Sequence, residues 1–283
     1  MPADTPPDAA ADSSPRFAFG RNWASFLRWL DDDRIAAAEA RMRELIGLDS
    51  LAGKTFIDIG SGSGLMSLCA MRLGATAVRS FDYDADSVAC TDELRRRYYP
   101  DDPRWVVSRG DATDDAFMAS LGTFDVVYSF GVLHHTGRMW HSIDLATRAV
   151  APGGRFAIAI YNHQGWRSRV WWWIKRIYVG LPQPLRFMWF LMILPRLELP
   201  LMAKDLLRLR PPWRHWQEYR RERGMSLWHD FVDWVGGFPF EVATPEQIFD
   251  CFRERGFVLE RLRTCAGGIG TNHFRFVRHA PAD

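Results

Sequence analysis

The chain has 283 residues, of which 47% are hydrophobic and 25% are charged. This composition excludes a largely disordered protein and suffices for one α/β domain that carries additional segments. The four cysteines lie far apart with no C-x-x-C pair, which argues against a disulfide framework or a zinc knuckle and predicts a reducing, cytoplasmic setting.

Positive charge is concentrated in one segment of the chain. The formal net charge of the whole sequence is only +2. Residues Trp166 to Arg223 contain thirteen Lys or Arg against four acids, a balance of +9, so the remainder carries −7. The same segment holds seven of the thirteen tryptophans, which makes it the main compositional break in the chain.

The N-terminal part divides into two stretches. Residues 1–16 are rich in Pro, Ala, Asp and Ser and lack the basic-then-apolar order of a signal peptide, so we expect a disordered tail and no export. Residues 17–50 are predicted to form an N-terminal helical cap, because Trp23, Phe26 and Leu27 recur at helical spacing.

Residues 51–163 alternate between short apolar runs and helical stretches. The predicted strands are Thr55 to Ile59, Ala77 to Phe81, Trp105 to Ser108, Phe124 to Ser129 and Arg155 to Ile160, and the predicted helices include Leu65 to Leu73, Ser87 to Tyr98 and Met139 to Val150. Strands that alternate with helices of this length indicate a mostly parallel sheet covered on both faces.

Residues 164–243 break this alternation: a basic, Trp-rich helical insert or lid is predicted after strand five, to about Arg223, and an acceptor-side segment follows it. The longest apolar run, Phe187 to Pro195, is far shorter than the roughly 20 residues that a membrane span needs. Three interpretations of the basic, Trp-rich composition stay open. It fits a helical lid packed on the core, an interfacial segment on the inner face of a membrane, or a nucleic-acid surface, although an overall pI near 8.4 is modest for the last.

The alternation resumes in residues 244–283. Pro245 to Arg255 reads as a helix with Thr244 as its N-cap and proline at its first position. Phe257 to Arg263 and His273 to Arg278 are predicted to form an antiparallel closing hairpin. The predicted fold is therefore α/β: a doubly wound, mostly parallel seven-stranded sheet with an antiparallel C-terminal strand.

A glycine-rich turn, Gly60-Ser61-Gly62-Ser63-Gly64, stands between the first predicted strand and the first helix of the sheet. Glycine lets the backbone approach a ligand closely because it has no Cβ. The dinucleotide fingerprint needs its third glycine at position 65, which is leucine here. Asp82 ends the next strand, where a carboxylate can accept both ribose hydroxyls. Together these features favour an adenosine ligand without a pyrophosphate.

Several further motifs follow in a fixed order, and at this point the sequence resembles the class I S-adenosylmethionine-dependent methyltransferases. Asp58 precedes the glycine turn, Gly110-Asp111 ends the third predicted strand, Phe124 to Ser129 forms the fourth, and Ala151-Pro152-Gly153-Gly154-Arg155 leads into the fifth. The resemblance covers residues 51–160. Phe19 to Trp23, His134 to Gly137 and Tyr161-Asn162 are similar to a branch of that family whose acceptor we do not identify.

The resemblance implies S-adenosylmethionine as the cofactor and gives several residues a role. The glycine turn lies against the methionine part, Asp82 binds the ribose, Asp111 accepts from the adenine amino group, and Ser129 with Phe130 supplies backbone contacts. The implied cofactor-binding residues are Asp58, Gly60, Ser61, Gly62, Gly64, Asp82, Tyr83, Asp111, Ala112, Ser129 and Phe130.

Candidate catalytic residues follow the fourth and fifth strands, because open α/β sheets bind ligands at the carboxyl ends of their strands. A sulfonium donor is already activated, so the protein aligns the nucleophile and, for a poor nucleophile, removes its proton. His135 is the preferred general base, and His134 is the second candidate, although either histidine can instead pack structurally. Tyr161 and Asn162 can position the substrate, or Asn162 can cap the turn before Gly165.

Beyond the insert, a polar and aromatic stretch from Trp228 to Glu241 is a candidate wall for the acceptor. The predicted substrate-binding residues are Asn162, His229, Asp230, Asp233 and Asn272. Capping and salt bridging are the alternative roles of these side chains. Their spacing matches no metal motif, so no metal site is predicted.

The leading hypothesis is methyl transfer to a hydroxyl, with carbon as second choice, of a small-molecule or lipid- or sugar-linked acceptor. A D/N-P-P-aromatic tetrapeptide is absent after strand four, where Ser129-Phe130-Gly131-Val132 stands, which disfavours exocyclic amines. One alternative is a catalytically silent adapter that docks on a membrane or a protein through the basic insert. Another is an RNA methyltransferase. The acceptor and the oligomeric state stay open.

Overall fold

The computed structural model of the chain describes residues 20–211, 234–268 and 270–280. These residues form two compact units, one made of residues 20–168 and 239–280 and the other of residues 169–211 and 234–238. The tail predicted for residues 1–16 lies outside the described residues.

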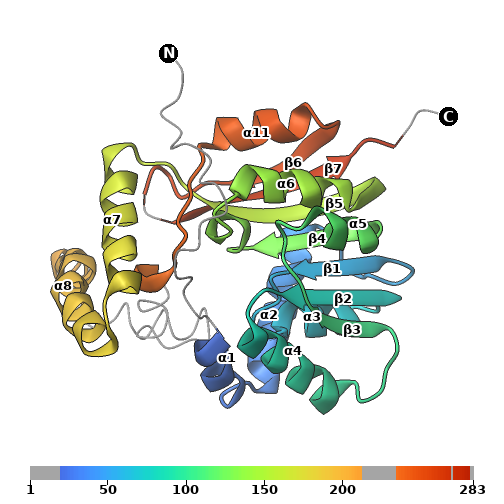
Figure 1. Cartoon of the computed structure of the whole chain (residues 1–283), viewed down its shortest axis with the longest axis horizontal. Helices are drawn as coiled ribbons and strands as arrows, with labels where there is room; N and C mark the ends of the chain where they lie inside the picture. Colours follow the sequence, from blue (N-terminus) through green and yellow to red (C-terminus); the bar gives the residue numbers. More distant parts are fainter. Residues whose placement is uncertain (1–19, 212–233, 269, 281–283) are drawn as a thin grey trace. The chain divides into compact units, whose positions relative to one another are not determined.

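The first unit is built on one seven-stranded sheet with the strand order β3-β2-β1-β4-β5-β7-β6 (Figure 1). The strands are β1 (Thr55–Ile59), β2 (Ala77–Asp82), β3 (Trp105–Arg109), β4 (Phe124–Phe130), β5 (Val150–Tyr161), β6 (Phe257–Arg263) and β7 (Thr271–Arg278). Neighbours from β3 to β5 pair in parallel, whereas β7 runs antiparallel to both β5 and β6. The predicted doubly wound sheet with its antiparallel last strand is thus confirmed.

Helices cover both faces of this sheet, as the alternation of strands and helices predicts. One face packs against α5 (Asp115–Ser120), α6 (Met139–Arg148) and α11 (Pro245–Arg253), and the other against α2 (Asp32–Ile46), α3 (Leu65–Arg72) and α4 (Ala85–Tyr98) (Figure 1). Alternate residues of β1 serve the two cores: Ile57 and Ile59 join the first, and Phe56 joins the second.

Two helices precede the sheet, as expected for the helical cap. α1 (Gly20–Leu27) contributes Leu27 to the second core, and α2 contributes Ile35, Met42 and Ile46. The Asp31 side chain accepts the Arg34 N–H at the start of α2, and Gly47 ends it in the left-handed region at φ 68°.

Some element boundaries differ from those predicted. β5 begins at Val150 rather than Arg155, because Val150 pairs with Phe124 ahead of a register shift. β3 ends at Arg109, one residue before Gly110, where the Phe117 ring fills the position that a Cβ would take. The short helix α5, capped by the Asp114 side chain, and the 3-10 turn η1 (Leu133–His135) are not predicted. α11 has the predicted Thr244 cap, within a full capping box.

The described part of the basic insert is helical, as predicted, and contains α7 (Trp166–Gly180) and α8 (Gln183–Leu207). The turn between them is tied by Arg186, whose guanidinium donates to the carbonyl oxygens of Leu181 and Val179, each at 2.7 Å. The Trp189 indole N–H donates to the Ile174 carbonyl at 3.2 Å. Among the described residues, neither these nor the other helices combine the length and apolarity required to cross a bilayer.

Candidate functional site

The glycine turn after β1 lies directly against the end of β2. Gly60, Gly62 and Gly64 all have positive φ, at 76°, 54° and 78°, where a side chain would be strained. The Gly62 N–H donates to Asp82 Oδ2 at 3.0 Å. The Asp84 N–H donates to Asp82 Oδ1 at 2.9 Å. The Asp82 carboxylate therefore stands at the glycine turn, as the sequence predicts.

Asp58 has a different environment. It alternates with Ile57 and Ile59, so its side chain points toward α3, where it is buried and accepts the Ser67 hydroxyl at 2.6 Å. The chain of hydrogen bonds continues behind it: the Ser80 hydroxyl donates to Ser67 at 2.7 Å. This arrangement gives Asp58 a structural part in fixing α3 against β1.

Both carboxyl groups carry raised pKa values in the ligand-free chain. Burial raises the pKa of Asp58 to about 7, with a smaller contribution from the charge of Asp82. Burial also raises the pKa of Asp82 to about 6, against the backbone hydrogen bonds that lower it. An opposite charge or a hydroxyl donor that arrived here would favour the ionised form of Asp82.

α1 covers the outer side of the glycine turn. A Cβ on Gly62 would meet the Trp23 indole at 3.1 Å, so the tryptophan lies close to the turn. Gly20 donates its N–H to Asp84 Oδ2 at 2.8 Å, and a Cβ there would stand 2.3 Å from the Asp86 Cβ. The sequence predicts this helix but not its place over the turn; the glycine at position 20 is the signal that the close approach requires.

The residues predicted to surround the adenosine lie at the ends of β2, β3 and β4. Asp111 accepts the N–H and the hydroxyl of Thr113, each at 2.8 Å, and Ala112 is buried beside it. Tyr83 is half exposed, and its carbonyl accepts from Arg109 at 3.1 Å. Ser129 is buried, with its hydroxyl donating to the Ile59 carbonyl at 3.3 Å.

Phe130 ends β4 and joins an aromatic row. Its ring stacks on Tyr128 with centroids 5.5 Å apart and meets His273 edge-on at 4.5 Å. Val132, two residues further on, occupies the space beside Gly60, where a Cβ would meet it at 2.3 Å. The end of β4 and the glycine turn of β1 are therefore in direct contact.

The two histidines that follow β4 differ in burial and in hydrogen bonding. His134 is fully buried, and its Nδ1 accepts the Tyr161 N–H at 3.3 Å. His135 is partly exposed, and its Nδ1 lies 2.6 Å from the Pro239 carbonyl oxygen. A carbonyl only accepts, so Nδ1 of His135 carries the hydrogen and the neutral ring has its lone pair on Nε2. The geometry distinguishes two residues that the sequence left nearly equivalent.

Residues 239–243 are anchored beside these histidines. Glu241 accepts the Met139 N–H at the start of α6, at 3.0 Å and 3.1 Å from its two oxygens, and its own N–H donates to the His134 carbonyl at 2.9 Å. The Ala243 N–H donates to the Tyr161 carbonyl at 3.0 Å. Tyr161 contacts three rings: His134 at 4.0 Å, His135 at 5.4 Å and Phe240 at 5.1 Å between centroids.

The predicted substrate-binding residues Asn162 and Asn272 are hydrogen-bonded to each other. The Asn272 amide donates to Asn162 Oδ1 at 3.0 Å, and Asn272 Oδ1 accepts the Cys265 N–H at 3.1 Å. Asn162 also donates to the Gly268 carbonyl at 3.4 Å. These bonds hold the β6–β7 loop against the end of β5. The predicted substrate-binding residues His229, Asp230 and Asp233 lie outside the described residues.

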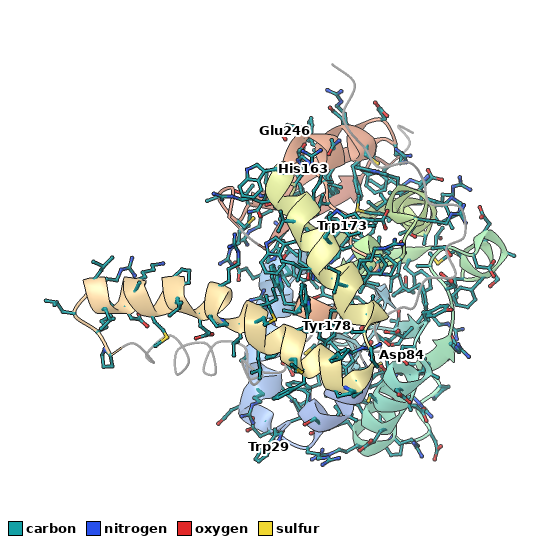
Figure 2. The ribbon with its side chains drawn as sticks, turned by 60° about the vertical axis from the view of Figure 1, so that its left-hand side comes forward. Trp29, Asp84, His163, Trp173, Tyr178 and Glu246 are labelled. Carbon is teal, nitrogen blue, oxygen red and sulfur yellow. The ribbon has the colours of Figure 1, made fainter. Side chains whose placement is uncertain are left out.

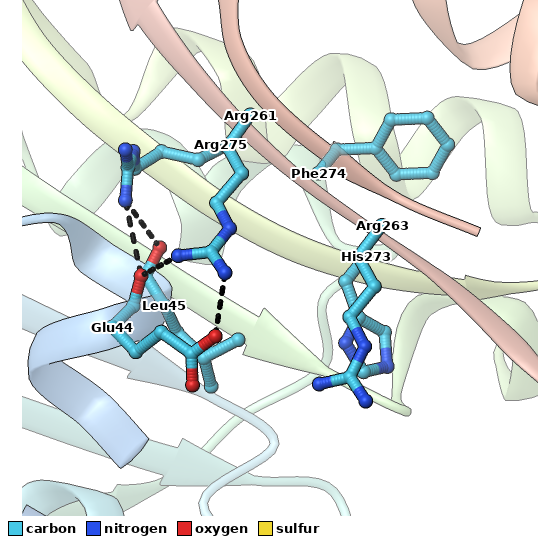
Figure 3. A pocket seen from close by; sticks show the side chains of 7 residues that line it. All are labelled: Glu44, Leu45, Arg261, Arg263, His273, Phe274 and Arg275. Carbon is cyan, nitrogen blue, oxygen red and sulfur yellow. Dashed lines mark hydrogen bonds and ion pairs between the residues drawn. The ribbon is translucent and has the colours of Figure 1, made fainter. Parts of the chain in front are cut away.

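A small pocket at the carboxyl end of α2 is lined by basic side chains that are already hydrogen-bonded within the protein (Figure 3). Arg275 donates to the Glu44 carbonyl at 3.1 Å, and Arg261 donates to the Glu44 side chain at 2.5 Å. Arg155 donates to the Gly47 carbonyl at 2.6 Å. These guanidinium groups satisfy the last carbonyls of α2 and complement its dipole. In the part of the chain that the structure describes, no group of three or more His, Cys, Asp or Glu side chains could hold a metal ion.

The comparison with known proteins matches the glycine turn and the sheet around it. A family described as "Methyltransferase domain" covers residues 57–158. The ribosomal protein L11 methyltransferase of Xanthomonas axonopodis pv. citri is 30% identical over 165 residues, which make up 57% of this chain and 47% of that protein. The ubiquinone biosynthesis O-methyltransferase of a Methylobacterium species is 32% identical over 129 residues, 46% of this chain and 49% of that protein. The chain thus spans about half the length of these curated relatives.

A solved methyltransferase structure shares the fold. Magnesium protoporphyrin IX methyltransferase from Synechocystis, solved with bound S-adenosylhomocysteine, superposes with a TM-score of 0.51 at 14% identity, over 91% of this chain and 95% of that one. The strand order, the antiparallel last strand and the matched domain agree with each other. Residues 57–158 therefore match a methyltransferase domain, and the sheet that carries them has the fold of a methyltransferase solved with S-adenosylhomocysteine.

Proposed function

We propose that this chain transfers the methyl group of S-adenosylmethionine to a hydroxyl oxygen of a small or lipid-linked acceptor, with His135 as the general base. A phenolic or enolic hydroxyl fits best. Such a group is acidic enough for a neutral imidazole to take its proton during the transfer, and Tyr161 and Phe240 supply aromatic surface close by.

The residues of the glycine turn fit the cofactor. Both oxygens of Asp82 accept backbone N–H groups, from Gly62 and Asp84, at the mouth of the turn where the carboxylate can also accept from the ribose. Glycines at positive φ leave the turn without side chains where the amino-acid end would lie. Asp111 and the backbone of Ser129 and Phe130 are assigned to the adenine side, Tyr83 and Ala112 flank them, and Asp58 holds the turn from behind.

The hydrogen bonding of His135 is the observation that supports an oxygen acceptor. The Pro239 carbonyl, 2.6 Å from Nδ1, holds the ring in the tautomer whose Nε2 accepts a proton. An amine needs no such base once it is neutral, whereas a hydroxyl is a poor nucleophile until its proton is removed. His134 is assigned a packing role, because it is buried and its Nδ1 already accepts from the Tyr161 N–H.

The reaction then needs little from the protein beyond alignment and proton removal. The bound cofactor supplies an electrophilic methyl group on a sulfonium. His135 Nε2 would take the hydroxyl proton, so that the acceptor oxygen could displace the thioether from the methyl group that the cofactor would supply. Tyr161 orients the acceptor.

Calorimetric titration with S-adenosylmethionine tests the cofactor half of the proposal. If the folded protein does not bind S-adenosylmethionine, the proposed cofactor is wrong. The acceptor is sought by incubating cell extract with methyl-labelled cofactor and the protein, and by separating small molecules and lipids from protein and RNA. We expect label in the small-molecule or lipid fraction. Label in a ribosomal protein, the substrate named for one relative, or in RNA would overturn the choice of acceptor.

Asp82→Ala separates an enzyme from an adapter that merely keeps the fold. An enzyme loses its biological activity with this variant while remaining folded. An adapter keeps it.

A further inference from the structure

The second compact unit exposes large apolar side chains on one side of α7. Val170, Trp173 and Ile177 follow at spacings of three and four residues, so they share a helix face, and Trp173 is 58% exposed (Figure 2). The opposite side of the same helix is buried through Trp171 and Tyr178. α7 therefore has an exposed apolar face in addition to the face that is buried in the protein.

α8 shows the same pattern. Leu185, Met188, Met192 and Leu199 recur at spacings of three, four and seven residues and form one stripe along the helix. Met192 is 71% exposed and Leu199 is 61% exposed. Single exposed apolar residues are ordinary, but consecutive turns of two helices that expose Trp, Met and Leu mark a binding surface.

The exposed charges of these two helices have one sign. On α7 the exposed charged residues include Arg169 and Arg176, and on α8 they are Arg196 and Lys204. Both acids of the described part of this unit are buried. They are Glu198 and Asp205, each 7% exposed. The described surface of the two helices therefore presents apolar side chains flanked only by positive charge.

We infer that these two helices dock the protein on an anionic phospholipid surface. The docking surface consists of Val170, Trp173, Ile177, Leu185, Met188, Met192 and Leu199 with Arg169, Arg176, Arg196 and Lys204. Apolar side chains would enter the interface between headgroups and acyl chains, with the tryptophan at headgroup level. The arginines and the lysine would contact lipid phosphate while their aliphatic stems stay in the apolar layer. Peripheral binding needs no spanning helix.

Other occupants fit the surface less well. A nucleic acid would use the arginines but leave the Met and Leu stripe of α8 in water. A second copy of the chain would bury the stripes but would bring like charges together. Only a surface that is both negatively charged and apolar beneath its charges satisfies both halves of the pattern.

Vesicle flotation of the full chain tests the inference. Vesicles of phosphatidylcholine alone are compared with an equimolar mixture of phosphatidylcholine and phosphatidylglycerol, at low and at high salt. We expect the protein to float with the anionic vesicles, at least about tenfold more strongly than with neutral ones, and high salt to weaken the binding.

A paired substitution locates the binding. Arg169→Glu with Trp173→Ser should lower binding to anionic vesicles about tenfold or more, because it reverses one charge and removes one aromatic anchor. The matched control is Arg28→Glu with Trp29→Ser, which changes an exposed arginine and a 69% exposed tryptophan of the first unit (Figure 2). It should bind as the wild type does. Unchanged S-adenosylmethionine affinity shows that each variant is folded.

Several results would overturn the inference. The wild type does not bind anionic vesicles, or the control pair loses as much binding as the Arg169→Glu/Trp173→Ser pair. Alternatively, the wild type is a dimer that does not bind vesicles, and the Arg169→Glu/Trp173→Ser pair dissociates it. Tight, salt-sensitive binding to RNA in place of vesicles would also reject it. Vesicle binding requires neither an acceptor nor methyl transfer, so its failure and a failure of the proposed reaction are separate outcomes.

Discussion

The glycine turn of β1 and the η1 turn after β4 are neighbours in the sheet, but they are assembled over different distances in sequence. In the first, Asp82 accepts from Gly62, twenty positions away. In the second, His135 is oriented by Pro239, 104 positions away, and Glu241 caps α6 across 102 positions. The proposed cofactor site is made from consecutive strand ends and is therefore visible in local motifs, whereas the proposed acceptor side depends on a segment more than 100 positions further along the chain.

The sharpest test of the acceptor side is His135→Ala. With an identified acceptor, removal of the His135 imidazole should lower kcat by about 10²- to 10⁴-fold and leave the Kd for S-adenosylmethionine unchanged. His141→Ala is the matched control, since His141 is partly exposed on α6, with its Nε2 3.0 Å from Asp115 Oδ2. An equal loss in both variants, or none in His135→Ala, would reject the assignment.

The cofactor side is tested by Asp82→Ala. Loss of two charge-assisted hydrogen bonds to the ribose should weaken S-adenosylmethionine binding about a hundredfold or more, as measured by calorimetry. Asp114→Ala removes the exposed cap of α5 instead and should leave the affinity as it is. If Asp82→Ala binds the cofactor normally, the ribose lies elsewhere.

Asp58→Asn tests whether the buried carboxyl is structural. Its pKa rises from 3.8 to about 7 on folding, so the folded chain holds this proton more tightly than the unfolded chain. The contribution of Asp58 to stability is thus full below about pH 4 and is lost as the pH rises through 7. The variant should gain roughly 2–4 kcal/mol in the free energy of unfolding at pH 8, since one pKa unit corresponds to about 1.4 kcal/mol.

Urea denaturation of wild type and variant at several pH values measures this difference. The gain should shrink steadily as the pH falls from 8 toward 4. A loss of stability at pH 8 would mean that the ionised carboxylate stabilises the fold, and a large loss of cofactor affinity would make Asp58 a direct partner of the ligand.

The pH dependence of cofactor binding sharpens the role of Asp82. Burial places its pKa at about 6, and hydroxyl donors prefer the ionised carboxylate. Affinity should therefore be constant well above pH 6 and should fall up to about tenfold for each unit below it. Calorimetry between pH 5 and 8 gives this profile, and Asp82→Asn should flatten it.

The smallest effect is expected for Glu241→Gln. The carboxylate accepts the Met139 N–H at the start of α6, where a negative charge interacts favourably with the helix dipole. Its neutralisation should cost about 0.5–1 kcal/mol of stability in thermal or urea unfolding. The same variant should lower kcat a few-fold without changing cofactor affinity, because the segment that positions His135 loosens. A change in cofactor affinity alone would contradict this.

The sequence by itself determined the parts whose signals are local. Alternating apolar runs and helical stretches predict the sheet, the three glycines predict the turn against which Asp82 stands, and Thr244 with Pro245 predicts the start of α11. Each signal lies within one turn or one strand-and-helix unit, where backbone geometry and side-chain spacing are tightly linked.

Tertiary structure decided the rest. Strand alternation placed the Asp58 side chain beneath α3, where it accepts the Ser67 hydroxyl, and contacts with residues 239–243 distinguished His135 from His134. Asn162 and Asn272, 110 positions apart, were paired with each other. Such contacts depend on which distant segments meet at one edge of the sheet, and no residue spacing along the chain encodes that meeting.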